Sequence, residues 1–146
     1  MSTDMVNNAY MNRAKIVAEQ SHCLRRKVGA VIVRDGRAIA LGVNGPGRGM
    51  EICTICSRDG VPSGEKLNEC YATHAEQAAI ASAAFAGRPT RGCTMFVTHR
   101  PCSSCMKLII AAGIKEVYFY YWYPDPLTDI LAGAAGVKLI QMGEEK

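Results

Sequence analysis

The stretch GCTMFVTHRPCSSCMKLIIAAGIKEV, residues 92–117, decides the fold of this 146-residue chain. Within it, the β-branched and apolar run Cys93–Thr98 predicts a strand, and Ser103–Ala112 predicts a helix. A second strand is expected at Val117–Tyr121. Strands that are linked through a helix run parallel in one sheet, so this stretch predicts a strand–helix–strand unit of an α/β fold.

The rest of the chain continues the alternation of helices and strands. Two of the further strands are joined through Asp35 and Gly36, which is a hairpin signal, and Thr3 or Asp4 is available to cap the first helix. The order αββαβαβαβ predicts one α/β domain, residues 1–146, with a mixed five-stranded sheet covered by helices on both faces. The further expected elements are helices at Met5–His22, His74–Ala86 and Leu127–Ala135, and strands at Val28–Val33, Ala38–Val43 and Val137–Gln141.

Composition excludes several classes of protein. Hydrophobic residues make up 49% of the chain and charged residues 21%, which is typical of a globular domain that needs no disulfides to hold its core. No stretch approaches the roughly 18 apolar residues of a membrane span, and Asp4 lies where a signal peptide would be apolar. We therefore expect a cytoplasmic protein without membrane contact.

Net charge and cysteine content limit the classes of ligand that the protein is expected to bind. A net charge of +4 suits a small anion, but the basic residues are too scattered to predict a nucleic-acid groove. The seven cysteines are an odd number, and in a reducing compartment cysteines bind metal, catalyse or pack more often than they form disulfides. The spacing of the cysteines must show which of these roles each one has.

Two segments carry metal-binding side chains at the predicted starts of helices. His74 and Glu76 open one helix, and Cys102 and Cys105 follow Pro101 at the start of another. Helix N-termini favour thiolates, and one His with two Cys suits tetrahedral Zn²⁺ with its fourth position left to water. Glu76 need not ligate, but it can accept a proton from that water and return it elsewhere. The sequence thus predicts a catalytic zinc site.

The pattern H-x-E followed by P-C-x-x-C is the signature of zinc deaminases. The segment 92–117 and the segment VGAVIVRDGRAIALGVNGPGRG, residues 28–49, extend the similarity well beyond the ligands. From about Cys23 to Tyr123 the chain resembles the deoxycytidylate (dCMP) deaminases of the cytidine deaminase superfamily. This resemblance implies a three-layer α/β/α sandwich, zinc at His74, Cys102 and Cys105, and Glu76 as the proton shuttle.

The resemblance also implies the reaction and two substrate contacts. dCMP would be hydrolysed to dUMP, for thymidylate synthesis, and ammonia, with a zinc-activated water attacking C4 and Glu76 protonating N3. The backbone N–H of Ala75 would hold the base carbonyl, and Asn44 would contact the sugar hydroxyl. Asn44 precedes a glycine, so it can instead be a turn residue.

A monophosphate substrate requires a cation. Arg26 and Lys27 beside the hairpin, or Arg48 in the glycine-rich loop, are the candidates, because arginine and lysine bind phosphate oxygens. Arg100 stands where many relatives carry an apolar or small residue, and it can face phosphate or solvent. Tyr123 follows a predicted strand near the expected pocket, where it can stack on a base or simply pack.

The segment Asn44–Thr73 is predicted to be a long loop, rich in Gly and Pro, and such a loop is usually functional or fixed by something other than a core. It contains a second CxxC pair. A closed zinc site would explain how the loop is held, with His22 or His99 as an alternative ligand if one cysteine only packs. The four cysteines of this second site are Cys23, Cys53, Cys56 and Cys70.

Other interpretations stay open at this point. The chain can be another superfamily deaminase, acting on free cytidine, a 5-substituted dCMP or tRNA adenosine, or a noncatalytic zinc-binding module. A purely structural site has no use for Glu76, which favours an enzyme. The resemblance further implies a homohexamer that dCTP activates and dTTP inhibits. The effector is expected at the loop Gly45–Gly49, which can equally be a plain surface turn.

Overall fold

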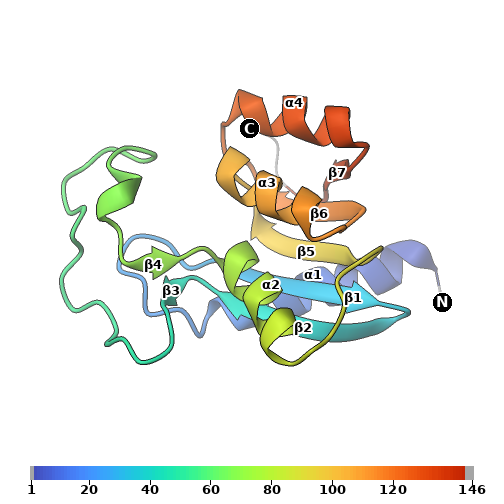
Figure 1. Cartoon of the computed structure of the whole chain (residues 1–146), viewed down its shortest axis with the longest axis horizontal. Coiled ribbons are helices and arrows are strands. Elements are labelled where there is room, and N and C mark those ends of the chain that lie inside the picture. Colours follow the sequence, from blue (N-terminus) through green and yellow to red (C-terminus); the bar gives the residue numbers. More distant parts are fainter. Residues whose placement is uncertain (1, 144–146) are drawn as a thin grey trace.

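The computed structural model describes residues 2–143, with one five-stranded sheet in the middle of the domain (Figure 1). Its strands are β1 (Gly29–Arg34), β2 (Arg37–Val43), β5 (Thr94–His99), β6 (Glu116–Tyr121) and β7 (Lys138–Gln141). The order across the sheet is β2-β1-β5-β6-β7. Because β1 runs antiparallel to β2 and β5, while β5, β6 and β7 run parallel, the predicted mixed sheet is confirmed.

Helices cover both faces of this sheet. The helices are α1 (Thr3–Ala18), α2 (Ala75–Phe85), α3 (Ser103–Ala111) and α4 (Pro126–Ala135). α1 packs against β1, β2 and β5 from one side, whereas α2 packs on β1 and β2 from the other, beside α3, which in turn contacts α4 (Figure 1). The connections from β5 through α3 to β6 and through α4 to β7 step in one direction, which places both helices on the same face. The predicted three layers are present.

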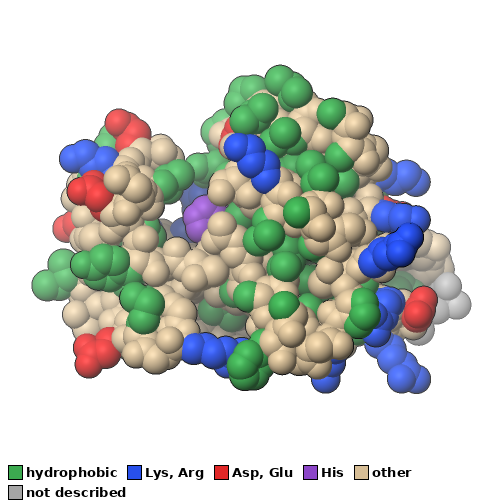
Figure 2. Space-filling view, viewed as in Figure 1, with side chains coloured by type: hydrophobic (Ala, Val, Ile, Leu, Met, Phe, Trp, Pro, Cys, Tyr) green, Lys and Arg blue, Asp and Glu red, His purple; other side chains and the backbone are tan. Residues whose placement is uncertain are grey.

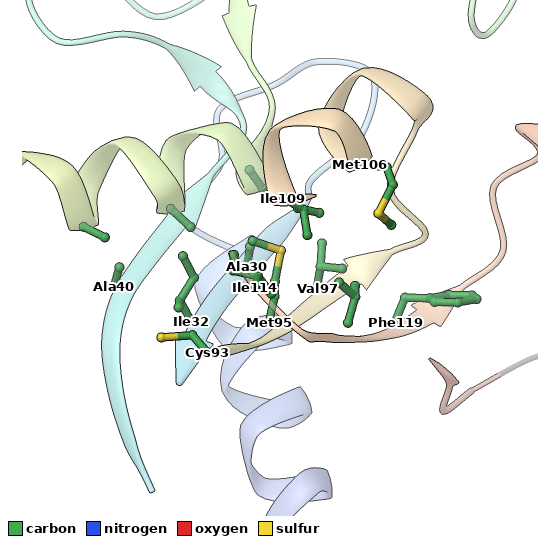
Figure 3. Close-up of a cluster of buried hydrophobic side chains, with 14 of the residues drawn as sticks. Ala30, Ile32, Ala40, Cys93, Met95, Val97, Met106, Ile109, Ile114 and Phe119 are labelled. Atoms are coloured by element: carbon green, nitrogen blue, oxygen red, sulfur yellow. The ribbon is translucent and has the colours of Figure 1, made fainter. Parts of the chain in front are cut away.

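Two apolar cores separate the layers. The larger lies under α2, α3 and α4, where side chains such as Ile32, Met95, Val97 and Ile109 are fully buried (Figure 3). The smaller lies under α1, where the ring of Phe96 stacks on Tyr118 at a centroid distance of 4.9 Å and on Tyr10 at 5.3 Å. Alternate residues of β5 therefore serve opposite faces, as a buried strand requires.

Two strand glycines let helix backbones approach the sheet closely. A Cβ on Gly29 would lie 2.2 Å from the carbonyl oxygen of Ala14 in α1, and a Cβ on Gly42 would lie 2.2 Å from that of Ala75 in α2. Real Cβ atoms do not approach backbone this closely, so any larger residue would push the helix away. Gly42 thereby seats the first turn of α2 against β2.

The first helix differs from its prediction at both ends. Its N-cap is Ser2, whose Oγ accepts a hydrogen bond from the amide of Met5, not Thr3 or Asp4. The helix ends at Ala18 instead of continuing to His22, because Ser21 turns away to hydrogen-bond Asn44. The predicted domain also includes residues 1 and 144–146, which lie outside the described residues. No helix within residues 2–143 has the length and apolarity to cross a bilayer.

The predicted long loop has short elements of its own. Residues Gly45–Pro46 (β3) and Ala72–Thr73 (β4) pair antiparallel, and a 3-10 turn covers Leu67–Glu69. Between β3 and β4 the chain, residues 47–71, projects from the domain, and we call this segment the lobe (Figure 1). The guanidinium of Arg25 ties this lobe down by donating to the carbonyl oxygens of Arg58 and Val61. Sequence periodicity could not indicate two-residue strands.

Candidate active site

The two ligand-bearing segments meet where α2 and α3 begin. His74 is the N-cap of α2, and Cys102 is the N-cap of α3, which follows directly from the end of β5. The backbone amide of His74 donates a hydrogen bond to the side-chain Oε1 of Gln77, at 2.9 Å, and this bond fixes the first turn of α2. Since both helices lie on one face of the sheet, their positive N-termini converge on the same spot.

His74, Cys102 and Cys105 come together there as predicted. Their ligand atoms all lie within 4.8 Å of one another, with Nδ1 of His74 3.2 Å from Sγ of Cys105 and 3.6 Å from Sγ of Cys102. Tetrahedral zinc with bonds of about 2.0 Å to nitrogen and 2.3 Å to sulfur requires an N–S separation of about 3.5 Å. The three side chains therefore fit a zinc ion.

The two thiols share their charge unequally. A hydrogen bond from Cys105 is the main cause that lowers the pKa of Cys102 to about 4, despite the opposing effect of burial. The same contact, with burial, raises the pKa of Cys105, and the hydrogen bond with Cys102 raises the pKa of His74. A divalent cation stabilises both thiolates and the neutral imidazole, so binding would release protons.

Glu76 lies beside these ligands on the first turn of α2. Its side chain is 5% exposed, and burial raises its pKa above the ordinary value. A carboxyl group with a raised pKa exchanges protons more readily near neutral pH than an ordinary glutamate does. Glu76 also lines the pocket in front of the ligands, so a bound molecule can reach it.

The pocket has a volume of about 230 Å³ and lies between the projecting lobe and the body of the domain. Figure 2 shows this hollow, with a histidine exposed in its wall. The lobe supplies one wall through Ser57, Arg58 and Gly64, and the helix starts supply its floor. The site is therefore an open cleft with its chemistry at the bottom.

Among the predicted substrate contacts, Asn44, Ala75, Arg26 and Tyr123 line the pocket. The guanidinium of Arg26 lies over the ring of Tyr123, 5.5 Å from its centroid, so the cation and the aromatic ring form one surface.

Lys27 and Arg48 do not reach the pocket. Lys27 turns to Glu19, with 3.7 Å between nitrogen and oxygen, and Arg48 lies over the exposed ring of Phe85 at 4.3 Å.

Asn44 has a structural task in addition to its place in the pocket. Its Oδ1 accepts hydrogen bonds from the backbone amide of Val28, at 2.8 Å, and the hydroxyl of Ser21, at 2.7 Å. Its Nδ2 donates to the carbonyl oxygen of Arg26, at 2.7 Å. One N–H of the amide lies outside these bonds, so the predicted sugar contact is compatible with this task. The left-handed turn conformation, which was the alternative for an Asn before Gly, is not adopted, because the non-glycine residues with positive φ in the described chain are Asp35 and Lys66.

Arg100 lines the pocket, but its guanidinium is paired within the domain and does not face solvent. It is 3% exposed and donates to the carbonyl oxygens of Tyr123 and Asp125, at 3.0 and 3.2 Å. Its other terminal nitrogen pairs with Asp129 at 2.6 Å, and its plane lies over the ring of Trp122. The residue therefore braces the start of α4 against the end of β5.

The second set of cysteines is gathered less closely. Cys23, Cys53, Cys56 and Cys70 are free thiols that line the pocket. Burial, with smaller contributions from the other three thiols, raises the pKa of Cys53. Within the described residues, however, only the three-residue site above brings its ligand atoms within 4.8 Å of one another.

Sequence reasoning missed the role of His99 as a pocket wall. Its Nδ1 lies 2.8 Å from Oγ1 of Thr98, and burial and the charge of Arg26 lower its pKa to about 4. His99 is therefore a neutral imidazole at pH 7. The alternation along β5 places it on the same face as Met95 and Val97, which was the available signal.

The comparisons with known proteins agree with this geometry. Residues 5–121 match the family described as the cytidine and deoxycytidylate deaminase zinc-binding region. The chain belongs to this family. A deoxycytidylate deaminase of Schizosaccharomyces pombe is 37% identical to this chain over 142 residues. That match covers 90% of this chain but 42% of the yeast protein, so the chain spans less than half the length of that relative.

Two further relatives align over more of their length. ComE operon protein 2 of Bacillus subtilis is 40% identical over 138 residues, which cover 93% of this chain and 70% of that protein. The crystal structure of a dCMP deaminase from cyanophage S-TIM5, in complex with dCMP and dUMP, superimposes with a TM-score of 0.83. It is 32% identical, and the match covers 97% of this chain and 99% of the phage chain. The deaminase fold is thus present over nearly the whole chain.

Proposed function

We propose that this protein is a zinc-dependent hydrolase that deaminates dCMP to dUMP and ammonia. The observation that carries the proposal is the three-ligand site of His74, Cys102 and Cys105, with buried Glu76 beside it at the bottom of the pocket. Three protein ligands leave the fourth position of a zinc ion to water, which separates a catalytic from a closed structural site. The similarity to a phage dCMP deaminase over 97% of the chain supports the substrate class.

The chain's own residues divide the work of the reaction. Zinc, when bound by these three side chains, would lower the pKa of a water molecule toward about 7. Glu76 takes a proton from the attacking water and delivers it to N3 of the cytosine, and a second transfer through Glu76 lets ammonia leave C4. The amide of Ala75 at the start of α2 has no partner within the helix, so it can donate to the base carbonyl. Water is consumed, and dUMP and ammonia are released.

We assign the phosphate to Arg26 and the sugar hydroxyl to Asn44. Of Arg26, Lys27 and Arg48, Arg26 is the one that lines the pocket, and its position over Tyr123 leaves the fork of its guanidinium for phosphate oxygens, whereas the guanidinium of Arg100 is already paired with Asp129. Tyr123 completes this subsite as a flat surface. Arg26→Gln is expected to raise KM for dCMP more than tenfold while KM for deoxycytidine changes little.

The decisive experiment compares substrates on the purified protein. We expect dCMP to be deaminated with a kcat/KM at least a hundredfold above that of deoxycytidine, with 5-substituted dCMP assayed in parallel. A preference for the unphosphorylated nucleoside would overturn the nucleotide assignment and favour a nucleoside deaminase. Absence of turnover on all of these, in protein that holds zinc, would favour a noncatalytic module or an adenosine deaminase of tRNA.

We further propose that Cys23, Cys53, Cys56 and Cys70 hold a second, structural zinc. All four line the pocket, and the lobe that bears three of them has little apolar packing, with Ile52 and Ile55 exposed. Metal ligands commonly close on their ion as it binds, which can draw separated sulfurs together. Metal analysis should give about two zinc ions per chain, and one in a Cys53→Ser/Cys56→Ser variant. A single ion in the parent protein would contradict this site.

We also propose a cytoplasmic homohexamer that is regulated by dCTP and dTTP. Large apolar side chains that are exposed on three helices, Ile16, Phe85 and Ile130, are consistent with association. Seven free thiols are consistent with a reducing compartment. Mass measurement in solution tests the assembly, and rate measurements with added dCTP or dTTP test the regulation. A monomer, or rates that ignore both nucleotides, would contradict the respective parts.

A further inference from the structure

The helix that carries both cysteine ligands begins without a cap of its own. Cys102 is the N-cap of α3, yet its side chain makes no capping hydrogen bond. Its Sγ instead lies 3.6 Å from Nδ1 of His74. An N-cap side chain normally accepts a hydrogen bond from an amide of the first turn. An N-cap side chain reaches the amides of the second and third helical residues, so the amide of Ser103, the first residue of α3, needs another acceptor.

Asp125 supplies that acceptor from a different helix. Its Oδ2 accepts a hydrogen bond from the backbone amide of Ser103, the first residue of α3, at 2.7 Å. Its Oδ1 accepts from the amide of Leu127 at 3.2 Å, as expected for the N-cap of α4. One carboxylate thus caps two helices. Burial opposes its charge, but the amides of Ser103 and Leu127 and nearby Arg100 lower the pKa of Asp125 overall.

Further contacts hold the starts of the two helices together. The hydroxyl of Thr128, which is fully buried on α4, donates to the carbonyl oxygen of Pro101 at 3.0 Å. Arg100 donates to the carbonyl oxygen of Asp125 at 3.2 Å. Pro101 and Arg100 immediately precede Cys102, so the carboxylate of Asp125 is held in a fixed relation to the ligand turn. This is the arrangement by which outer residues orient metal ligands.

We propose that Asp125 is a positioning residue for the metal site. By accepting the hydrogen bond of the Ser103 amide, it fixes the first turn of α3 and keeps both cysteines of this helix directed at His74. The inference rests on the proposed zinc site, but not on the identity of the substrate. It assigns to Asp125 an effect on metal affinity beyond the stability that any helix cap contributes.

The test measures zinc affinity by competition with a chelator in Asp125→Ala, Asp125→Asn and the matched control Ser2→Ala. Ser2 caps α1, which bears no ligand, so its loss should lower the unfolding midpoint and leave zinc affinity unchanged. We expect Asp125→Ala to weaken zinc binding about 10- to 100-fold. Asp125→Asn has one acceptor oxygen for two amides and should fall between Asp125→Ala and the parent.

Two outcomes would overturn the inference. One is zinc affinity within twofold of the parent in Asp125→Ala, together with an unfolding midpoint lowered as in Ser2→Ala. If Asp125→Ala does not fold, zinc affinity within twofold of the parent in Asp125→Asn has the same meaning. Parent protein that binds zinc without deaminating dCMP would remove the proposed function, while this comparison of zinc affinities would still stand.

Discussion

The two faces of the sheet differ in what they bury. Under α1 the interior is an apolar and aromatic stack around Phe96, whereas under α2, α3 and α4 it also contains the carboxyl of Glu76 and the guanidinium of Arg100. Buried ionisable groups cost free energy unless they are well partnered. The packing under α1 therefore serves only to stabilise the fold. The packing under α2, α3 and α4 is less favourable than an apolar interior would be, because it also buries ionisable groups. Matched changes on the two faces should separate stability from activity.

The largest expected effect is that of Glu76→Gln. The amide keeps the shape of the side chain but cannot carry a proton, so kcat for dCMP should fall about 10²- to 10⁴-fold. Zinc content and unfolding free energy should be maintained, because no ligand is lost and a buried carboxyl is removed. Steady-state rates, metal analysis and denaturant unfolding give the three values. On the other face, Tyr10→Phe, which removes a 2.6 Å hydrogen bond to Gly36, should leave kcat unchanged. Turnover of Glu76→Gln near that of the parent would rule out the shuttle.

Two buried methionines allow the next comparison. Met11 on α1 is 2% exposed, and Met106 on α3, next to Cys105, is fully buried. Each change to Ala should lower the free energy of unfolding by about 2–5 kcal/mol, because it leaves a cavity. Only Met106→Ala should also weaken zinc binding. Denaturant unfolding and chelator competition measure the two effects, and weaker zinc binding in Met11→Ala would show that the faces are not independent.

The close glycines give a smaller but more local contrast. Gly29→Ala and Gly42→Ala should each destabilise by about 1–3 kcal/mol, since the added methyl meets helix backbone. Gly42→Ala displaces the turn that carries Ala75 and Glu76, so it should also reduce kcat, whereas Gly29→Ala displaces α1 and should not. Thermal unfolding and initial rates provide the comparison. Equal losses of kcat in both variants would contradict it.

The last comparison concerns pH, and its effect is confined to acidic conditions. Because the pKa of His99 is lowered to about 4, the unfolded chain binds more protons at this residue between pH 6.5 and pH 4. His99 should therefore contribute stability that is complete above about pH 6.5 and is lost as the pH falls toward 4. Unfolding free energies measured across this range should fall less steeply in His99→Gln. If the unfolding free energies of parent and variant fall equally with pH, the imidazole of His99 is protonated as easily in the folded protein as in the unfolded chain, which would contradict this prediction.

The sequence allowed a functional residue to be placed where that residue lies next to a predictable helix start. His74, Cys102 and Cys105 each lie at a helix start, after a strand or a turn, so their meeting point could be predicted from connectivity. Arg100 could not be interpreted in this way, because its partners lie about 25 residues further along the chain, at the start of α4. Whether a basic side chain points into the pocket also depends on the tertiary structure. Periodicity therefore could not show that Arg26 lines the pocket and that its neighbour Lys27 does not.

The same limit applies to the projecting lobe. Its composition predicted a loop, and its cysteines predicted a metal site, but the lobe is held through backbone pairing and Arg25, which local sequence does not encode. The two-residue strands β3 and β4 have no period to detect. Short, nonlocal pairings of this kind are where sequence reasoning loses information.

The pairing of β3 with β4 has an evolutionary consequence. Gly45 faces Thr73 and Pro46 faces Ala72, so the two ends of the lobe are held together at its base. Extra residues between closed ends cost little, about 0.6 kcal/mol for each doubling of length. Insertions, deletions or wholesale replacement between these strands can therefore remodel the pocket wall, and with it substrate choice, while the ligand-bearing helices keep their places.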